Sequence, residues 1–173
     1  MSLLLVILTP FLGAALVAGV ARRSRLHTAW ASGAITLAAL AWLLPLAPAS
    51  FAGETVIQRL SWLPTAGLDL IFRLDGLGLL FALLILLIGL LIILYARYYL
   101  SPSDCMGRFY AFLLLFMGSM LGVALSENII QLLIFWELTS LSSFLLISYW
   151  KQRSEARNGA RMALAVTGFG GLA

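Results

Sequence analysis

"DGLGLLFALLILLIGLLIILYARYY" (residues 75–99) decides the fold class, because no charged residue occurs between Asp75 and Arg97. A run of about 20 apolar residues is long enough for a helix to cross the hydrocarbon core of a bilayer. The whole chain is 62% hydrophobic and 10% charged, and its mean hydropathy is +1.05. Soluble domains carry about 25% charged residues. The sequence therefore predicts an integral membrane protein.

Other apolar runs extend this prediction to an all-α integral membrane helix bundle. We expect complete transmembrane helices at residues 3–21, 28–46, 75–99, 109–125 and 128–149, with Pro45 and Pro48 ending the second. A sixth helix begins near residue 158 and is still apolar at residue 173, after too few residues to cross a bilayer. We therefore expect residues 1–173 to form a single membrane domain, the N-terminal portion of a longer chain.

The segment between the second and third helices has a different pattern. Residues 55–62 ("TVIQRLSW") and 68–74 ("LDLIFRL") favour strands, and "PTAG" at residues 64–67 carries turn signals. This pattern predicts a short β-hairpin within residues 54–74, outside the membrane.

Basic residues are unevenly divided between the two sides of the predicted bundle. Two of the eleven, Arg59 and Arg73, fall in the hairpin. The other nine lie in the gaps on the opposite side: Arg22, Arg23, Arg25, Arg97, Arg108, Lys151, Arg153, Arg157 and Arg161. The positive-inside rule places these nine in the cytoplasm and the N-terminus outside. Topology thus accounts for the net charge of +4, and nucleic acid is not needed as a partner.

Glu137 is the acid that stands out, near the middle of "QLLIFWELTSLSSFLLISYW" (residues 131–150). Placing a charge at the bilayer centre costs about 2.5–3.5 kcal/mol on insertion scales, so such residues face a bundle interior or a water-filled cavity. Helical spacing places Ser140 and Ser148 on nearly the same stripe. Glu137 either binds and releases a proton, with a pKa set by desolvation and a nearby cation, or is a structural group that holds helices together.

The remaining features are weaker. Asp75 fits an N-cap of the third helix, with a role at the outer mouth of an ion path as the alternative. "GSMLG" (residues 118–122) fits close helix packing. Neither His27 nor Cys105 is assigned a role. The sequence has no phosphate loop, metal-spaced Cys/His set, haem motif or nucleophile–base pair, so we expect no cofactor, no metal and no enzyme chemistry.

Three stretches resemble the antiporter-like family, which comprises large subunits of Mrp cation/proton antiporters and proton-pumping membrane subunits of complex I. They are "SWLPTAGLDLIFRLDGLGLLFALL" (61–84), "FYAFLLLFMGSMLGVALSENIIQLLIFWELTSLSSFLLISYW" (109–150) and "ARNGARMALAVTGFGGLA" (156–173). "FWELTSLSSFLLI" (135–147) is most similar to the A-type large subunit of the Mrp antiporters. The resemblance is strong from Ser61 onward and is only a general hydrophobic pattern before it.

The resemblance implies that the chain is part of a multisubunit Na⁺(K⁺)/H⁺ antiporter, a secondary transporter driven by the proton motive force. Glu137 would be its proton-translocation site, supported by Trp136, Ser140 and Ser148. It would work with a lysine on a later helix, which would set its pKa. The implied partners are other small membrane subunits, the lipid bilayer, H⁺ and Na⁺ (or K⁺ or Li⁺), in the bacterial inner membrane. The alternatives are a proton-pumping subunit of complex I or a membrane-bound hydrogenase, and a purely structural module.

Overall fold

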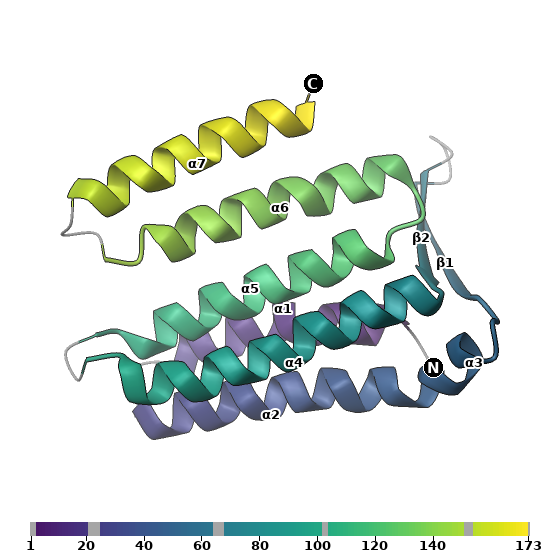
Figure 1. The fold of residues 1–173 in the computed structure, drawn as a ribbon, viewed down its shortest axis with the longest axis horizontal. Helices are drawn as coiled ribbons and strands as arrows, with labels where there is room; N and C mark the ends of the chain where they lie inside the picture. Colours follow the sequence, from purple (N-terminus) through teal and green to yellow (C-terminus); the bar gives the residue numbers. More distant parts are fainter. Residues whose placement is uncertain (1–2, 21–24, 64–67, 102–103, 151–153, 173) are drawn as a thin grey trace.

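The computed structural model describes residues 3–20, 25–63, 68–101, 104–150 and 154–172. Helices dominate it, as the composition predicts. The helical elements are α1 (Leu3–Val20), α2 (Arg25–Leu43), η1 (Leu44–Leu46), α3 (Ala47–Phe51), α4 (Gly76–Tyr99), α5 (Met106–Leu125), α6 (Ile129–Ile147) and α7 (Ser154–Leu172). The strands are β1 (Val56–Leu63) and β2 (Leu68–Leu74). Figure 1 shows the long helices side by side, with the hairpin and α3 at one end of the bundle.

Within the described residues, four segments are long and apolar enough to cross a membrane: His27–Phe51, Gly76–Tyr99, Met106–Leu125 and Ile129–Ile147. The first helix is apolar over Leu3–Gly19 and shorter than these four. Pro45 and Pro48 do not stop the helical path, because the chain continues through η1 and α3 to Phe51. Each proline lies in the first turn of its short helix, where a missing N–H is tolerated. The last helix begins at Ser154, four residues before the predicted start.

The predicted hairpin is confirmed. β1 and β2 pair antiparallel, with Val56 opposite Leu74 and Ser61 opposite Asp69. The predicted turn at residues 64–67 lies outside the described residues. The hairpin is tied to the helices by its main chain, because Phe72 forms an isolated bridge with Ser126 in the turn between α5 and α6.

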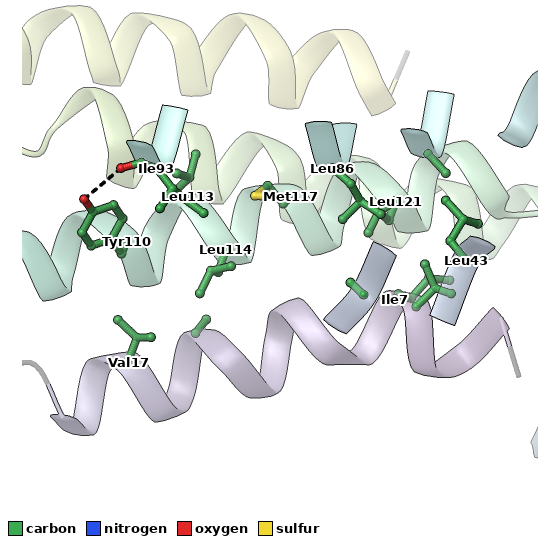
Figure 2. Packing of buried hydrophobic residues seen from close by; sticks show 14 of the residues in the cluster. Ile7, Val17, Leu43, Leu86, Ile93, Tyr110, Leu113, Leu114, Met117 and Leu121 are labelled. Atoms are coloured by element: carbon green, nitrogen blue, oxygen red, sulfur yellow. Dashed lines mark hydrogen bonds between the residues drawn. The ribbon is translucent and has the colours of Figure 1, made fainter. Parts of the chain in front are cut away.

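The core lies where α1, α2, α4 and α5 meet, and α2 and α5 each contact the other three helices. Figure 2 shows buried side chains from these helices, including Leu86, Leu114 and Leu121, each 0% exposed. The buried Tyr110 hydroxyl donates a hydrogen bond to the Ile93 main-chain oxygen of α4 at 3.1 Å. α6 packs on the far side of α5, and α7 packs on α6.

The two ends of the bundle differ, as the charge count predicts. One end of the bundle lies opposite the hairpin (left in Figure 1). It holds the C-terminal ends of α1, α4 and α6 and the N-terminal ends of α2, α5 and α7. The helix ends that flank the predicted basic gaps therefore lie at one end of the bundle, and the hairpin lies at the other. Which end faces the cytoplasm remains a prediction.

Candidate functional site at the middle of α6

Glu137 lies halfway along α6, on a helix that begins with an Asn128 cap. The Asn128 side-chain oxygen accepts a hydrogen bond from the Ile130 N–H at 2.9 Å, satisfying one of the free donors of the first helical turn. Glu137 is the single ionisable residue of α6, whose other side chains are apolar, hydroxyl-bearing or, at Gln131, an amide. The carboxylate therefore lies halfway along a helix whose start is fixed by its cap.

One carboxylate oxygen of Glu137 is buried. Glu137 Oε1 has essentially no exposed surface, and the described part of the chain gives it no hydrogen-bond partner. A buried polar atom without a partner costs about 1–3 kcal/mol, and more when it is charged. Such an atom needs a proton, a water molecule or a cationic group to satisfy it.

Two different surroundings meet at this carboxylate. On one side is an open groove of about 480 Å³, in which Glu137 is the single ionisable residue among the lining side chains: Ile130, Leu133, Ile134, Glu137, Leu138 and Leu141. On the other side α7 approaches closely, since a Cβ atom at Gly171 would lie 3.1 Å from Glu137 Oε1 and 2.8 Å from Trp136 Nε1. The absence of a side chain at Gly171 lets the α7 backbone reach the acid.

The hydroxyl groups of α6 point to their own helix and not to the acid. Ser140 Oγ donates to the Trp136 main-chain oxygen at 3.3 Å, and Ser148 Oγ donates to the Leu145 oxygen at 3.3 Å. Thr139 and Ser142 make similar bonds, to the oxygens of Trp136 and Leu138. Ser140 is buried beside the acid's stripe, whereas Ser148 is at the far end of the helix. Of the proposed supports, Trp136 and Ser140 therefore lie near Glu137 and Ser148 does not.

Asp75 acts as the N-cap that its sequence position predicts. Its Oδ1 accepts a hydrogen bond from the Gly78 N–H at 2.8 Å. The other oxygen lies 3.5 Å from Arg73 Nε, and Arg73 Nη1 also lies 3.4 Å from Glu127 Oε1. These charges are at the hairpin end of the bundle, whereas Glu137 lies halfway along α6.

Gln131 is a site residue to which the sequence assigned no role. Its side chain is 3% exposed, and its Oε1 accepts a hydrogen bond from the Ile71 N–H of β2 at 2.8 Å. The Glu127 N–H donates to the Ile71 oxygen at 3.0 Å. The start of α6 is thus bonded to both main-chain groups of one hairpin residue. The polar residue two turns before the acid was visible in the sequence, but its partner was not.

The glycines of "GSMLG" (residues 118–122) allow close packing, because an aromatic ring from another helix lies against each of them. A Cβ atom at Gly118 would lie 2.9 Å from the Phe11 ring, and one at Gly122 would overlap the Phe135 ring. Phe135 lies two residues before Glu137 and also faces Phe11 and Phe72, with ring centroids 6.4 and 6.2 Å apart. The rings of α1, β2 and α6 therefore set how α6 sits on α5.

Comparison with known proteins identifies the family. Residues 62–110 match the family model described as NADH-ubiquinone oxidoreductase (complex I), chain 5 N-terminus. Residues 126–173 match the one described as NADH:quinone oxidoreductase/Mrp antiporter, TM. The chain belongs to this antiporter-like family. The resemblance of residues 61–84, 109–150 and 156–173 is confirmed, and the second match includes Glu137.

Among antiporter-like proteins, two curated relatives are close in sequence. The chain is 48% identical over 167 residues to the A/B component of a probable K⁺/H⁺ antiporter of Rhizobium meliloti, covering 96% of this chain and 17% of the relative. It is 49% identical over 148 residues to the A1 component of a Na⁺/H⁺ antiporter of Staphylococcus aureus, covering 86% of this chain and 18% of the relative. The chain therefore spans less than a fifth of the length of these two relatives.

Solved structures agree with the assignment. The chain superposes on the Mrp complex of Dietzia sp. with a TM-score of 0.84 and 29% identity, covering 99% of this chain and 18% of that one. The archaeal membrane-bound sulfane sulfur reductase shares the fold, with a TM-score of 0.80 and 21% identity over 98% of this chain and 34% of that one. This antiporter-like chain is a multi-pass membrane protein whose helix bundle and hairpin match the Mrp membrane fold.

Proposed function

We propose that this chain is the N-terminal portion of the A-type large subunit of a multisubunit monovalent cation/proton antiporter, and that Glu137 is its intramembrane proton-translocation site. The relatives named as components of Na⁺/H⁺ and K⁺/H⁺ antiporters support the transport class. The observation that carries the residue assignment is the buried Oε1 of Glu137, which has no hydrogen-bond partner among the described residues.

The chemistry follows from two states of this carboxyl group. Protonated, it is neutral and tolerates the apolar groove formed by its neighbours on α6. Ionised, it needs a compensating cation, which the described residues do not supply within hydrogen-bonding distance. Arrival or departure of such a cation would therefore change its proton affinity and couple proton movement to the movement of Na⁺, K⁺ or Li⁺.

Trp136 and Ser140 have supporting roles in this proposal, and Ser148 has a lesser one. The Trp136 indole and the acid both face Gly171 of α7, so the ring limits the space into which the carboxylate can move. The Ser140 hydroxyl is held by the main chain beside the acid and can rotate to donate to an ionised oxygen. Ser148 and Asp75 lie near opposite ends of the helices, so we propose that they help hydrate the ends of the path.

The test compares two chemically identical substitutions in the complete antiporter complex, placed in everted membrane vesicles. Glu137→Gln should reduce Na⁺- or K⁺-dependent dissipation of the pH gradient to the level of vesicles without the complex. The matched control, Glu127→Gln, removes an exposed carboxylate at the α5–α6 turn and should retain transport. Wild-type transport by the assembled Glu137→Gln complex would refute the assignment. Loss of assembly in place of transport would favour a structural carboxyl.

A redox-driven proton pump is the second candidate, because both family descriptions name an NADH:quinone-type oxidoreductase and the sulfane sulfur reductase shares the fold. Purifying the tagged protein with its natural partners separates the two. Iron–sulfur or flavin proteins in the purified complex would favour the pump. Small membrane proteins alone would favour the antiporter in the bacterial inner membrane.

A further inference from the structure

An aromatic and basic patch covers the end of α2 and α4 away from the hairpin. It consists of Trp30 on α2 and Tyr95, Arg97, Tyr98 and Tyr99 on α4, and is called the Arg97 patch below. Four of its five members are strongly exposed: Trp30 is 64%, Tyr95 62%, Tyr98 75% and Tyr99 62% exposed. Large aromatic side chains at the end of a membrane helix belong at the level of the lipid headgroups.

Arg97 is held in the middle of this patch by its neighbours' rings. Its guanidinium carbon lies 5.3 Å from the centroid of the Trp30 ring and 5.4 Å from that of the Tyr98 ring. The guanidinium is therefore fixed between two helices that pack together. Aromatic faces occupy the flat sides of a guanidinium and leave its in-plane N–H donors free to bind an anion.

None of the ion pairs among the described residues includes Arg97. Arg73 is paired with Asp75 and Glu127, and Arg108 donates to the Tyr149 main-chain oxygen at 2.8 Å. Asp104 is the described carboxylate side chain at this end of the bundle, and its Oδ2 accepts from the Ser101 N–H. A positive charge thus stays available in the patch.

An apolar stripe leads away from the patch into the membrane. Exposed leucines recur along α4 at helical spacing, at Leu84, Leu87, Leu91 and Leu94. A phospholipid has the same sequence of groups, with a phosphate at the interface and acyl chains running along the membrane normal. Basic pockets between transmembrane helices are known to bind anionic headgroups.

We propose that the Arg97 patch binds an anionic phospholipid, with the phosphate on the Arg97 guanidinium between Trp30 and Tyr98 and an acyl chain along the leucine stripe of α4. This site is separate from Glu137, which lies on α6, on the other side of α5. The proposed lipid site rests on the charge and shape of the surface, and it does not depend on the proposed transport reaction.

The test is native mass spectrometry of the assembled complex in detergent, titrated with phosphatidylglycerol or with phosphatidylcholine. Arg97→Gln should weaken binding of one phosphatidylglycerol about fivefold, the effect of one basic side chain at an anionic surface, and leave phosphatidylcholine binding unchanged. Arg97→Lys keeps the positive charge but loses the planar guanidinium, and Trp30→Leu keeps the charge but loses the aromatic ring beside it. Each should weaken phosphatidylglycerol binding less than Arg97→Gln does. Arg161→Gln is the matched control, because Arg161 is exposed on α7 and should bind as the wild type does.

Three results would overturn the proposal. The first is equal phosphatidylglycerol binding by the wild type and Arg97→Gln. The second is full displacement of the lipid by inorganic phosphate, which would make the patch a free-anion site. The third is loss of a partner protein from the Arg97→Gln complex with lipid binding retained, which would make the patch a protein interface.

Discussion

α5 and α6 are neighbouring helices of nearly equal length and hydropathy, yet they have opposite environments. α5 spans 20 residues with hydropathy 1.8, and α6 spans 19 with hydropathy 1.7, but 56% of the α5 span is buried against 17% of the α6 span. α5 contacts α1, α2, α4 and α6, whereas α6 packs between α5 and α7. Hydropathy therefore identifies both as membrane helices and does not distinguish the more buried helix, α5, from the less buried one, α6.

The surroundings of the two helices bear on the proposed role of Glu137. The carboxylate is absent from α5, whose side chains fill the described core, and present on α6, where a groove and a glycine of α7 border it. A buried charge inside α5 would have no room for water or a moving partner. On α6 the acid borders an open groove and lies close to Gly171 of α7, a setting that is compatible with the proposed proton site.

The largest expected effect comes from pressing the two helices apart. Gly122→Val adds side-chain atoms where the Phe135 ring lies, and we expect it to destabilise the fold by about 3 kcal/mol, at the upper end of typical overpacking costs. The measurement is loss of helicity on SDS titration of the chain in mild-detergent micelles. Gly168→Val on α7 is the control, because a Cβ atom there would meet nothing within 4 Å beyond its chain neighbours and its own helix backbone. Equal losses for the two variants would show that α5 and α6 do not meet through this ring.

A second prediction compares cavities in the two helices. Leu114 of α5 is 0% exposed and Leu141 of α6 is 50% exposed. Leu114→Ala should cost about 2 kcal/mol through the cavity it leaves, and Leu141→Ala should cost little because lipid or detergent fills the space. The same titration in micelles measures both. A greater loss of stability for Leu141→Ala would contradict the conclusion that α5 is more tightly packed than α6.

Local rules predicted the elements that depend on neighbouring residues. The strands at 55–62 and 68–74, the Asp75 cap and the apolar helices follow from alternation, capping chemistry and hydropathy, which act within a few residues. The helical path past Pro45 was missed because each proline falls in the first turn of a new short helix, where it is tolerated. Local sequence does not distinguish that position from a helix end.

The sequence singled out Glu137 as an ionisable residue within an apolar helix, but it revealed only part of the surroundings of that residue. Glu137 was found because one ionisable group in an apolar helix is visible without a structure. Ser148 shares its stripe by helical spacing, but its hydroxyl bonds to its own helix. The contacts of Gln131 with Ile71 and of Gly171 with the acid join residues far apart in the chain. Such contacts are set by tertiary packing, which the periodicity of the sequence does not predict.

The third prediction concerns the bond that fixes the start of α6. Gln131→Leu keeps the volume but removes the acceptor for the Ile71 N–H, and an unsatisfied buried donor costs about 1 kcal/mol or more. We expect faster hydrogen–deuterium exchange at the β2 amides and the first turn of α6, with exchange in α5 unchanged. Gln58→Leu is the control on β1, since Gln58 bonds the Leu4 N–H at the start of α1. It should loosen that contact and leave α6 as protected as in the wild type.

The smallest expected effect is at the hairpin end, where Arg73 bridges Asp75 and Glu127 at 3.5 and 3.4 Å. These side chains are 37–43% exposed, so solvent and salt screen the pairs and Glu127→Gln should cost below about 1 kcal/mol. The cost should shrink further in high salt, whereas the Gly122→Val cost should not, because packing overlap is insensitive to ionic strength. A salt-independent loss of several kcal/mol in Glu127→Gln would mean that the α5–α6 turn is held by this charge. The contact between α5 and α6 would then depend on the Arg73–Glu127 ion pair at their turn more than on the packing of the Phe135 ring.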